Sequence, residues 1–179
     1  MTAAVKVWDP MVRIFHWGLA TSFVVAWVTG DEWDALHHWA GYAAAGLIAF
    51  RLIWGVIGSR YARFTQFIQS PSKTIAYLKD IVTGRENRYL GHNPAGAAMI
   101  LALLAAMAGC ALTGWMYTTD AYWGVNWVEQ THKFLANALL ALVLLHLGGV
   151  LLASMRHHEN LIRAMITGRK RRPGHGDIS

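Results

Sequence analysis

The feature that most constrains this sequence is a long apolar run that carries two histidines, His132 and His146. They are fourteen residues apart, close to four turns of an α-helix, so both imidazoles project from nearly the same face, about 21 Å apart along the axis. A polar ring inside an apolar segment of membrane length is costly and by default indicates function. Two such rings on one face predict two sites at different depths in a membrane, each needing an opposite ligand from elsewhere in the chain.

The composition is that of a membrane protein. Of the 179 residues, 55% are hydrophobic, and the mean hydropathy of +0.30 is too high for an ordinary soluble domain. Cys110 is the only cysteine. This excludes a disulfide within the chain, a zinc site built on thiolates, an iron–sulfur cluster and covalent haem attachment through a C-x-x-C-H motif.

Four apolar segments are each long enough to cross a hydrocarbon core of roughly 30 Å as a helix. They predict transmembrane helices at about 11–30, 35–57, 93–117 and 130–155. The polar segment 58–92 is expected to contain a short surface helix, with Ser72 as its N-cap and Gly84 just after its end. The basic tail, 156–179, is expected to be loose. The sequence thus predicts an all-α integral membrane protein, with one domain over residues 1–179 built as a four-helix transmembrane bundle.

The cations are distributed unevenly along the chain. With four spans, the segments 1–13, 58–92 and 156–179 lie on one side of the membrane, and they hold fourteen of the sixteen Lys and Arg residues. The two opposite loops carry five acidic residues and one cation: Asp31, Glu32, Asp34, Asp120, Glu129 and Lys133. The positive-inside rule therefore places both termini in the cytoplasm. Next to a span, the basic GRKRR run favours lipid contact rather than nucleic-acid binding.

Further histidines lie at matching depths. His16 is near the cytoplasmic end of the first span, and His37 and His38 are near the outer end of the second. Pairing by depth joins His16 to His146, and His37 or His38 to His132. Because haem iron takes histidine as an axial ligand, the pattern predicts two bis-histidine haem sites, one above the other. Both haems would be held non-covalently.

Only one of the two adjacent histidines can face the bundle axis, because one residue step turns a helix by about 100°. From His37 the same face continues through Gly41, Ala44, Ile48 and Arg51. The small residues leave room for a porphyrin. The face of His38 continues through Tyr42, Ala45 and Ala49. The pattern favours His37 and leaves His38 open.

Three cations lie within about a turn of a ligand's depth: Arg13, Arg51 and Lys133. They are candidates for neutralising the charge of haem propionates. The alternative interpretation is that they are interfacial cations that extend toward water.

Four stretches of the chain carry a resemblance to known proteins: WDPMVRIFHW (8–17), HHWAGYAAAGLIAFRLIWGVIGSRYARF (37–64), YLGHNPAGA (89–97) and the H-x13-H of the last span. Together they resemble the bacterial di-haem cytochrome b family, which contains cytochrome b561-type proteins and the b-type cytochrome subunits of nickel–iron hydrogenases. The resemblance covers nearly the whole chain. It implies a bundle enclosing two haem b groups, with His16, His37, His132 and His146 as ligands. The family's second-helix ligand stands four residues before a glycine and fourteen before an arginine, which matches His37, Gly41 and Arg51.

The resemblance also implies a function: electron transfer across the bacterial cytoplasmic (inner) membrane. One end would be the quinone pool, with ubiquinone or menaquinone, and the other a periplasmic hydrogenase, another dehydrogenase or a cytochrome c. Arg13, Arg51, His92 and Asn93 gather near the cytoplasmic end, so we expect the quinone pocket there.

The sequence leaves two other classes of function open. The first is a self-sufficient membrane oxidoreductase, such as a superoxide:quinone oxidoreductase, which needs a positive outer entrance. Lys133 is the only cation on that side, so steering of an anion is weak. The second is a structural or assembly subunit, which would show no haem spectrum.

The cation asymmetry makes orientation testable. We expect a reporter fused after Ser179 to be active as a cytoplasmic reporter and inactive as a periplasmic one, because the positively charged segments stay on the cytoplasmic side. Paired fusions of an enzyme active only in the periplasm and a fluorophore active only in the cytoplasm make the measurement. Periplasmic activity would overturn the four-span arrangement.

Overall fold

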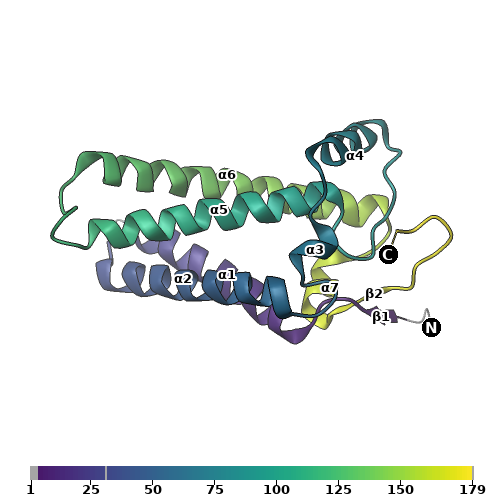
Figure 1. The fold of residues 1–179 in the computed structure, drawn as a ribbon, viewed down its shortest axis with the longest axis horizontal. Coiled ribbons are helices and arrows are strands. Elements are labelled where there is room, and N and C mark those ends of the chain that lie inside the picture. Colours follow the sequence, from purple (N-terminus) through teal and green to yellow (C-terminus); the bar gives the residue numbers. More distant parts are fainter. Residues whose placement is uncertain (1–3, 31, 179) are drawn as a thin grey trace. The chain divides into compact units, whose positions relative to one another are not determined.

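The computed structural model describes residues 4–30 and 32–178. Four long helices dominate it, labelled in Figure 1 as α1 (Pro10–Thr29), α2 (Asp34–Ile57), α5 (Pro94–Tyr117) and α6 (Asn126–Arg156). All four are long and apolar enough to cross a membrane. The predicted all-α membrane fold is confirmed, and the helix bounds lie close to the expected ones. Asp31, in the expected acidic turn, lies outside the described residues.

Helix α6 begins one turn earlier than the expected residue 130. Val128, which the prediction left in a loop, is completely buried in the first turn. Glu129 lies in the same turn, where a carboxylate complements the helix dipole. It also pairs with Lys133 one turn later, at 2.6 Å. Burial and charge together extend this helix toward its N-terminus.

The start of α1 is fixed by Asp9, which stands directly before Pro10. The Oδ1 of Asp9 accepts a hydrogen bond from the Val12 N–H at 2.9 Å, as an N-cap does. Its Oδ2 accepts from Ser59 Oγ at 2.5 Å and from Trp54 Nε1 at 3.3 Å. Burial raises the pKa of Asp9, but these hydrogen bonds outweigh it and bring the pKa below its ordinary value. Residues at the end of α2 therefore help to hold the first helix.

The chain divides into two compact units. The first unit contains Met1–Arg13, Ile53–Leu101 and Leu145–Ser179, and the second contains Ile14–Leu52 and Ala102–Leu144. The first unit has an apolar core of small and large side chains from distant parts of the sequence: Val7, Trp8, Val12, Ala62, Leu90 and Ala164.

The polar segment after α2 contains two short helices, α3 (Phe64–Phe67) and α4 (Pro71–Thr83). Helix α4 is the expected surface helix, and Gly84 ends it in the left-handed conformation, with φ 68°. Its N-cap is Ser70 rather than Ser72. The prediction was wrong by two residues because Pro71, whose fixed φ suits the first helical position, starts the helix earlier.

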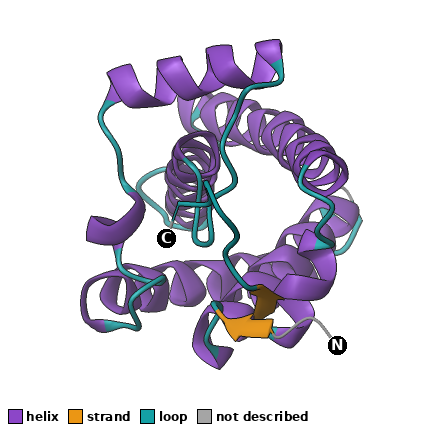
Figure 2. Ribbon diagram, turned by 90° about the vertical axis from the view of Figure 1, so that its right-hand side faces the viewer, coloured by secondary structure: helices purple, strands orange, loops and turns teal. Residues whose placement is uncertain are grey.

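The tail after Arg156 is ordered, so the expectation of a loose tail was wrong. It forms α7 (Leu161–Thr167), capped by the side chain of Asn160, and then strand β2 (Arg169–Arg171). Strand β2 pairs antiparallel with β1 (Ala4–Lys6), and these are the two orange strands of Figure 2. Between α7 and β2, the carbonyl of Gly168 accepts hydrogen bonds from the N–H groups of Val7 and Trp8, at 2.8 and 3.1 Å.

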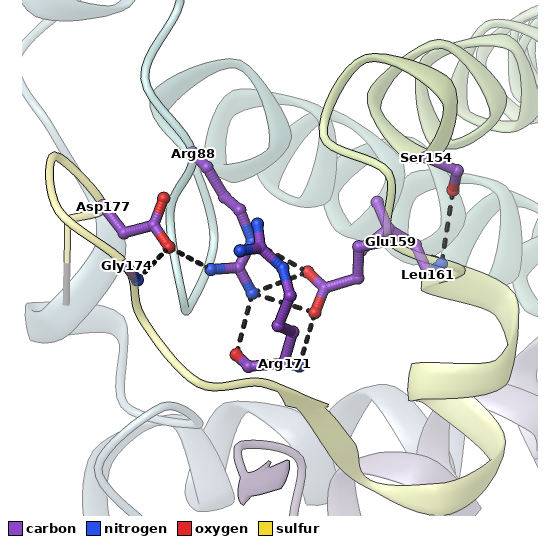
Figure 3. A network of polar contacts seen from close by, with 7 residues as sticks. All are labelled: Arg88, Ser154, Glu159, Leu161, Arg171, Gly174 and Asp177. Atoms are coloured by element: carbon purple, nitrogen blue, oxygen red, sulfur yellow. Dashed lines mark hydrogen bonds and ion pairs between the residues drawn. The ribbon is translucent and has the colours of Figure 1, made fainter. Parts of the chain in front are cut away.

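A buried ion-pair network holds this tail (Figure 3). The Arg88 guanidinium, with 4% of its side chain exposed, donates to both carboxylate oxygens of Glu159 at 2.9–3.1 Å, and it also pairs with Asp177. The backbone of Arg171 joins from both sides: its carbonyl accepts from Arg88, and its N–H donates to Glu159. Burial raises the pKa of Glu159, but these donors more than offset it and lower the pKa below its ordinary 4.5.

We expect Arg88→Ala to release the tail, because it leaves the Glu159 carboxylate buried without its main partner. Breaking a buried pair in this way costs about 3–5 kcal/mol. Hydrogen exchange should speed up over residues 4–8 and 159–171 and stay unchanged in the middle of α5. Arg85→Ala, which removes an exposed arginine from the same loop, is the matched control.

The same network makes the stability of the wild-type protein depend on pH. Because folding lowers the pKa of Glu159, the contribution of this carboxylate to the free energy of unfolding is complete above pH 4.5. That contribution is lost as the pH falls below this value. Equal hydrogen-exchange rates in the Arg88→Ala and Arg85→Ala proteins would contradict the role of the network in holding the tail.

Candidate functional site

Two of the predicted ligands, His37 and His132, are neighbours in the second unit. His37 lies in the first turn of α2 and His132 in the second turn of α6. Their ring centroids are 6.0 Å apart, with the ring planes at 74°. A metal–imidazole bond is about 2 Å long and the ring centre lies roughly 1 Å beyond the bonded nitrogen, so two imidazoles sharing one metal have centres about 6 Å apart. The observed separation fits that arrangement.

Each of these rings is anchored by a backbone carbonyl of the neighbouring helix. His37 Nδ1 donates to the carbonyl of Ala26 on α1 at 2.8 Å, and His132 Nδ1 donates to the carbonyl of Cys110 on α5 at 2.9 Å. A carbonyl only accepts, so the proton of each neutral ring is on Nδ1 and the lone pair is on Nε2. This is the tautomer of a metal-binding histidine whose second nitrogen is held by the protein.

Glycines allow the neighbouring helices to approach these rings. A Cβ added at Gly114 on α5 would lie 3.0 Å from His132 Cε1, which is tighter than almost all natural contacts. A Cβ at Gly30, after α1, would lie 3.6 Å from His37 Nδ1, an ordinary contact. Close approach is therefore required at His132 in particular.

Helix α5 contains no histidine, and the sequence predicts no site residue in it. The structure brings three of its positions to His132: the Cys110 carbonyl, Gly114, and Thr113, whose Oγ1 lies 3.3 Å from His132 Nδ1. A backbone carbonyl leaves no signal in the residue types. The available signal was Thr113, a hydroxyl that is only 7% exposed in an otherwise apolar helix.

The other predicted ligands belong to different units. His16 is half-buried on α1 in the second unit, with its ring edge-on to Trp17 at 5.1 Å. His146 is half-buried on α6 in the first unit. The pairing of His16 with His146 stays a prediction. His38 is exposed, and its neighbour His37 is half-buried.

The three candidate cations differ in their surroundings. Arg51, in α2, is only 3% exposed, and its guanidinium carbon lies 5.9 Å from the centre of the Phe15 ring. Arg13 Nη1 donates to the carbonyl of Ile166, near the end of α7, at 2.5 Å. Lys133 is largely exposed and ion-paired with Glu129. Of these three cations, Arg51 is thus the most deeply buried.

His92, considered for a quinone pocket, lies in the first unit between two aromatic rings. Its centroid is 4.5 Å from that of Trp8 and 4.7 Å from that of Phe67. Asn93, next to it, accepts a hydrogen bond from the Gly96 N–H at 2.7 Å and so caps α5. Of these two polar residues, Asn93 therefore has a clear structural task.

Within residues 4–30 and 32–178, no group of three or more His, Cys, Asp or Glu side chains is placed to hold a metal ion. A neighbouring pair of imidazoles instead suits a metal whose remaining ligands arrive with it, as they do in haem. The residues around His37 and His132 fit that group: two ring centroids 6.0 Å apart, with each ring held through Nδ1 so that Nε2 keeps its lone pair.

Comparison with known proteins agrees with this chemistry. The chain is 28% identical over 158 residues to a probable Ni/Fe-hydrogenase B-type cytochrome subunit of Cupriavidus necator, covering 71% of this chain and 64% of that protein. It is 23% identical over 215 residues to a protein of the same description in Rhodobacter capsulatus, covering 93% and 81%. The chain thus spans slightly less than two thirds of the first relative's length. No solved structure matches it.

A sequence model of a known family matches nearly the whole chain, over residues 7–168. The matched region includes all four long helices and every histidine discussed above. A b-type cytochrome binds haem b and transfers electrons. The chain belongs to the family described as prokaryotic cytochrome b561.

Proposed function

We propose that this protein carries electrons across the bacterial cytoplasmic membrane through two bis-histidine haem b sites, between the quinone pool and a periplasmic redox partner. The observation that carries the proposal is the His37–His132 pair, with ring centroids 6.0 Å apart and both Nδ1 atoms bound to carbonyls. When bound, haem b supplies one-electron oxidation and reduction of iron. The chain holds the imidazoles in the ligating tautomer and surrounds them with apolar helix.

The second site would use His16 and His146. Helix α6 is continuous from Asn126 to Arg156, so His132 and His146 are about 21 Å apart along it. Two sites at this separation would cover most of a hydrocarbon core of roughly 30 Å. They would act in series within a single domain, with α6 giving one ligand to each.

Burial along α2 supports His37 over His38 as a ligand. The face that contains His37 continues through buried side chains: Ala44, Ile48 and Arg51 are 3%, 6% and 3% exposed. The face of His38 continues through Tyr42, which is 46% exposed. A ligand to an enclosed cofactor belongs on the buried face.

Arg51 is the strongest candidate to bind a haem propionate. Ionised side chains inside a membrane span are costly and are held by partners of opposite charge. A propionate carboxylate is such a partner, and Arg51 lies on the same face of α2 as His37. Arg13, which donates to the Ile166 carbonyl, and Lys133, which pairs with Glu129, stay candidates as well.

Charge and the relatives support the proposed partners. The cation asymmetry supports cytoplasmic termini, and the His37–His132 site would then lie on the periplasmic side. The relatives' descriptions support a hydrogenase as the partner there, with another dehydrogenase or a cytochrome c as alternatives. The quinone, ubiquinone or menaquinone, would bind at the cytoplasmic end, where His92 is a polar ring held between aromatic side chains.

The superoxide oxidoreductase alternative receives no such support. It needs free positive charge at the periplasmic entrance to attract an anion. Lys133 is ion-paired with Glu129 at 2.6 Å, so the cation expected to provide that charge is largely neutralised.

Single alanine variants of the histidines test the proposal. We expect two non-covalent haem b groups per chain in the wild type and in His38→Ala. His37→Ala and His132→Ala should disturb one haem, and His16→Ala and His146→Ala the other. The measurements are a pyridine haemochrome assay, reduced-minus-oxidised spectra, and electron transfer across liposomes from a quinol to an enclosed acceptor.

Electron transfer should fail in the four ligand variants, because the sites act in series. A wild-type protein with one haem or none would defeat the proposal. Loss of the same haem in His16→Ala and His132→Ala would defeat the pairing, and haem loss in His38→Ala but not in His37→Ala would reverse the choice of ligand.

Two glycines of α2 test whether the porphyrin lies along the His37 face. A Cβ added at Gly41 or at Gly46 would meet nothing within 4 Å, so the protein itself tolerates a side chain at either position. Gly41 lies one turn after His37, whereas Gly46 is exposed on another face. We expect Gly41→Leu to lower haem content and Gly46→Leu to leave it unchanged, at equal protein yield. Equal haem content in both variants would place the porphyrin elsewhere.

A further inference from the structure

We infer that Thr113, on the histidine-free helix α5, is a positioning residue for His132, and that its hydroxyl tunes the redox potential of the His37–His132 site. The inference rests on the proposed function, because it takes His132 to be a haem ligand. It concerns a residue that neither touches the iron nor carries a charge.

The geometry gives the His132 Nδ1–H two acceptors on α5. The Cys110 carbonyl oxygen is 2.9 Å from Nδ1, and Thr113 Oγ1 is 3.3 Å from it. Thr113 Oγ1 is also 2.8 Å from the carbonyl of Gly109, to which it donates its own proton. The hydroxyl can therefore accept from the imidazole while it donates to the helix backbone.

This double role separates Thr113 from an ordinary threonine in a helix. A buried threonine commonly satisfies its hydroxyl by donating to the carbonyl four residues earlier, and that bond alone needs no partner on another helix. Here the hydroxyl donates to the helix backbone, where the carbonyl oxygens of Gly109 and Cys110 are 2.8 and 3.1 Å away, and its lone pairs remain to accept from His132 at 3.3 Å. A hydroxyl that is already donating is also a better acceptor, because hydrogen bonds in a chain polarise one another in an apolar setting.

The effect on the redox potential follows from the basicity of the His132 imidazole. An imidazole whose second nitrogen donates a strong hydrogen bond is a more basic ligand. A more basic ligand stabilises the oxidised iron relative to the reduced iron, so it lowers the midpoint potential. Hydrogen bonding around axial ligands is one of the means by which a protein sets a haem's potential. Removing the Thr113 hydroxyl should therefore raise the potential of this site.

Cys110 provides the matched control. Its carbonyl binds His132, but its Sγ is 3.7 Å from Nδ1, and sulfur is a weak hydrogen-bonding partner. Replacing the side chain by alanine keeps the carbonyl. Cys110→Ala thus alters the packing beside the same ring without removing a strong acceptor.

The test compares Thr113→Val, Thr113→Ser and Cys110→Ala with the wild type. Valine keeps the shape of threonine without the hydroxyl, and serine restores the hydroxyl. We expect Thr113→Val to retain both haems, with the midpoint potential of one raised and that of the other unchanged. The low-spin electron paramagnetic resonance signal of that same haem should shift. Thr113→Ser and Cys110→Ala should titrate like the wild type.

Unchanged potentials in Thr113→Val, or an equal rise in Cys110→Ala, would overturn the inference. Loss of one haem in Thr113→Val, with wild-type haem content in Thr113→Ser and Cys110→Ala, would support it as a role of the hydroxyl in holding the ring. The proposed function fails by a different result: His132→Ala keeping both haems with wild-type spectra.

Discussion

The site depends on one constraint: an imidazole inside a membrane span must use both of its nitrogens, since there is no water to bind either one. In His37 and His132, one nitrogen donates to a backbone carbonyl and the other is left with a lone pair, which the proposed haem iron would bind. The carbonyls come from Ala26 and Cys110, whose helical positions would ordinarily turn them to their own helix. Each carbonyl oxygen that fixes a ring is therefore shared between the imidazole and the hydrogen bonds of its own helix.

This constraint explains which parts of the site the sequence could predict. Histidines in apolar helices stand out because charged and polar groups are rare there, and helix geometry converts their spacing into depth. Ala26 and Cys110 contribute only backbone atoms, so their residue types carry no signal for the role. Thr113 was visible as a polar residue, but only the approach of α6 distinguishes it from a threonine bound to its own helix.

The tail shows the complementary limit. Basic composition favoured a loose segment, yet Arg88 binds Glu159 and Asp177 across more than seventy residues of sequence. Composition indicates how much apolar surface a segment can bury. It does not reveal an ion pair whose two partners are both shielded from water. The long helices were predictable because their signal is local, whereas the tail is held by contacts that are distant along the chain.

Within the second unit, each of these two histidines is oriented by its own helical hairpin. The α1–α2 hairpin supplies both His37 and the carbonyl that holds it, and the α5–α6 hairpin supplies both His132 and its carbonyl. The tautomer of each ring is thus set by contacts that are short in sequence and independent of the other ring. A metal between the two Nε2 atoms would then join two hairpins that are already oriented for it. The fold has then already ordered both side chains, so cofactor binding does not have to bear that entropic cost. Side chains ordered in advance form a rigid pair of ligands that moves little when the cofactor binds.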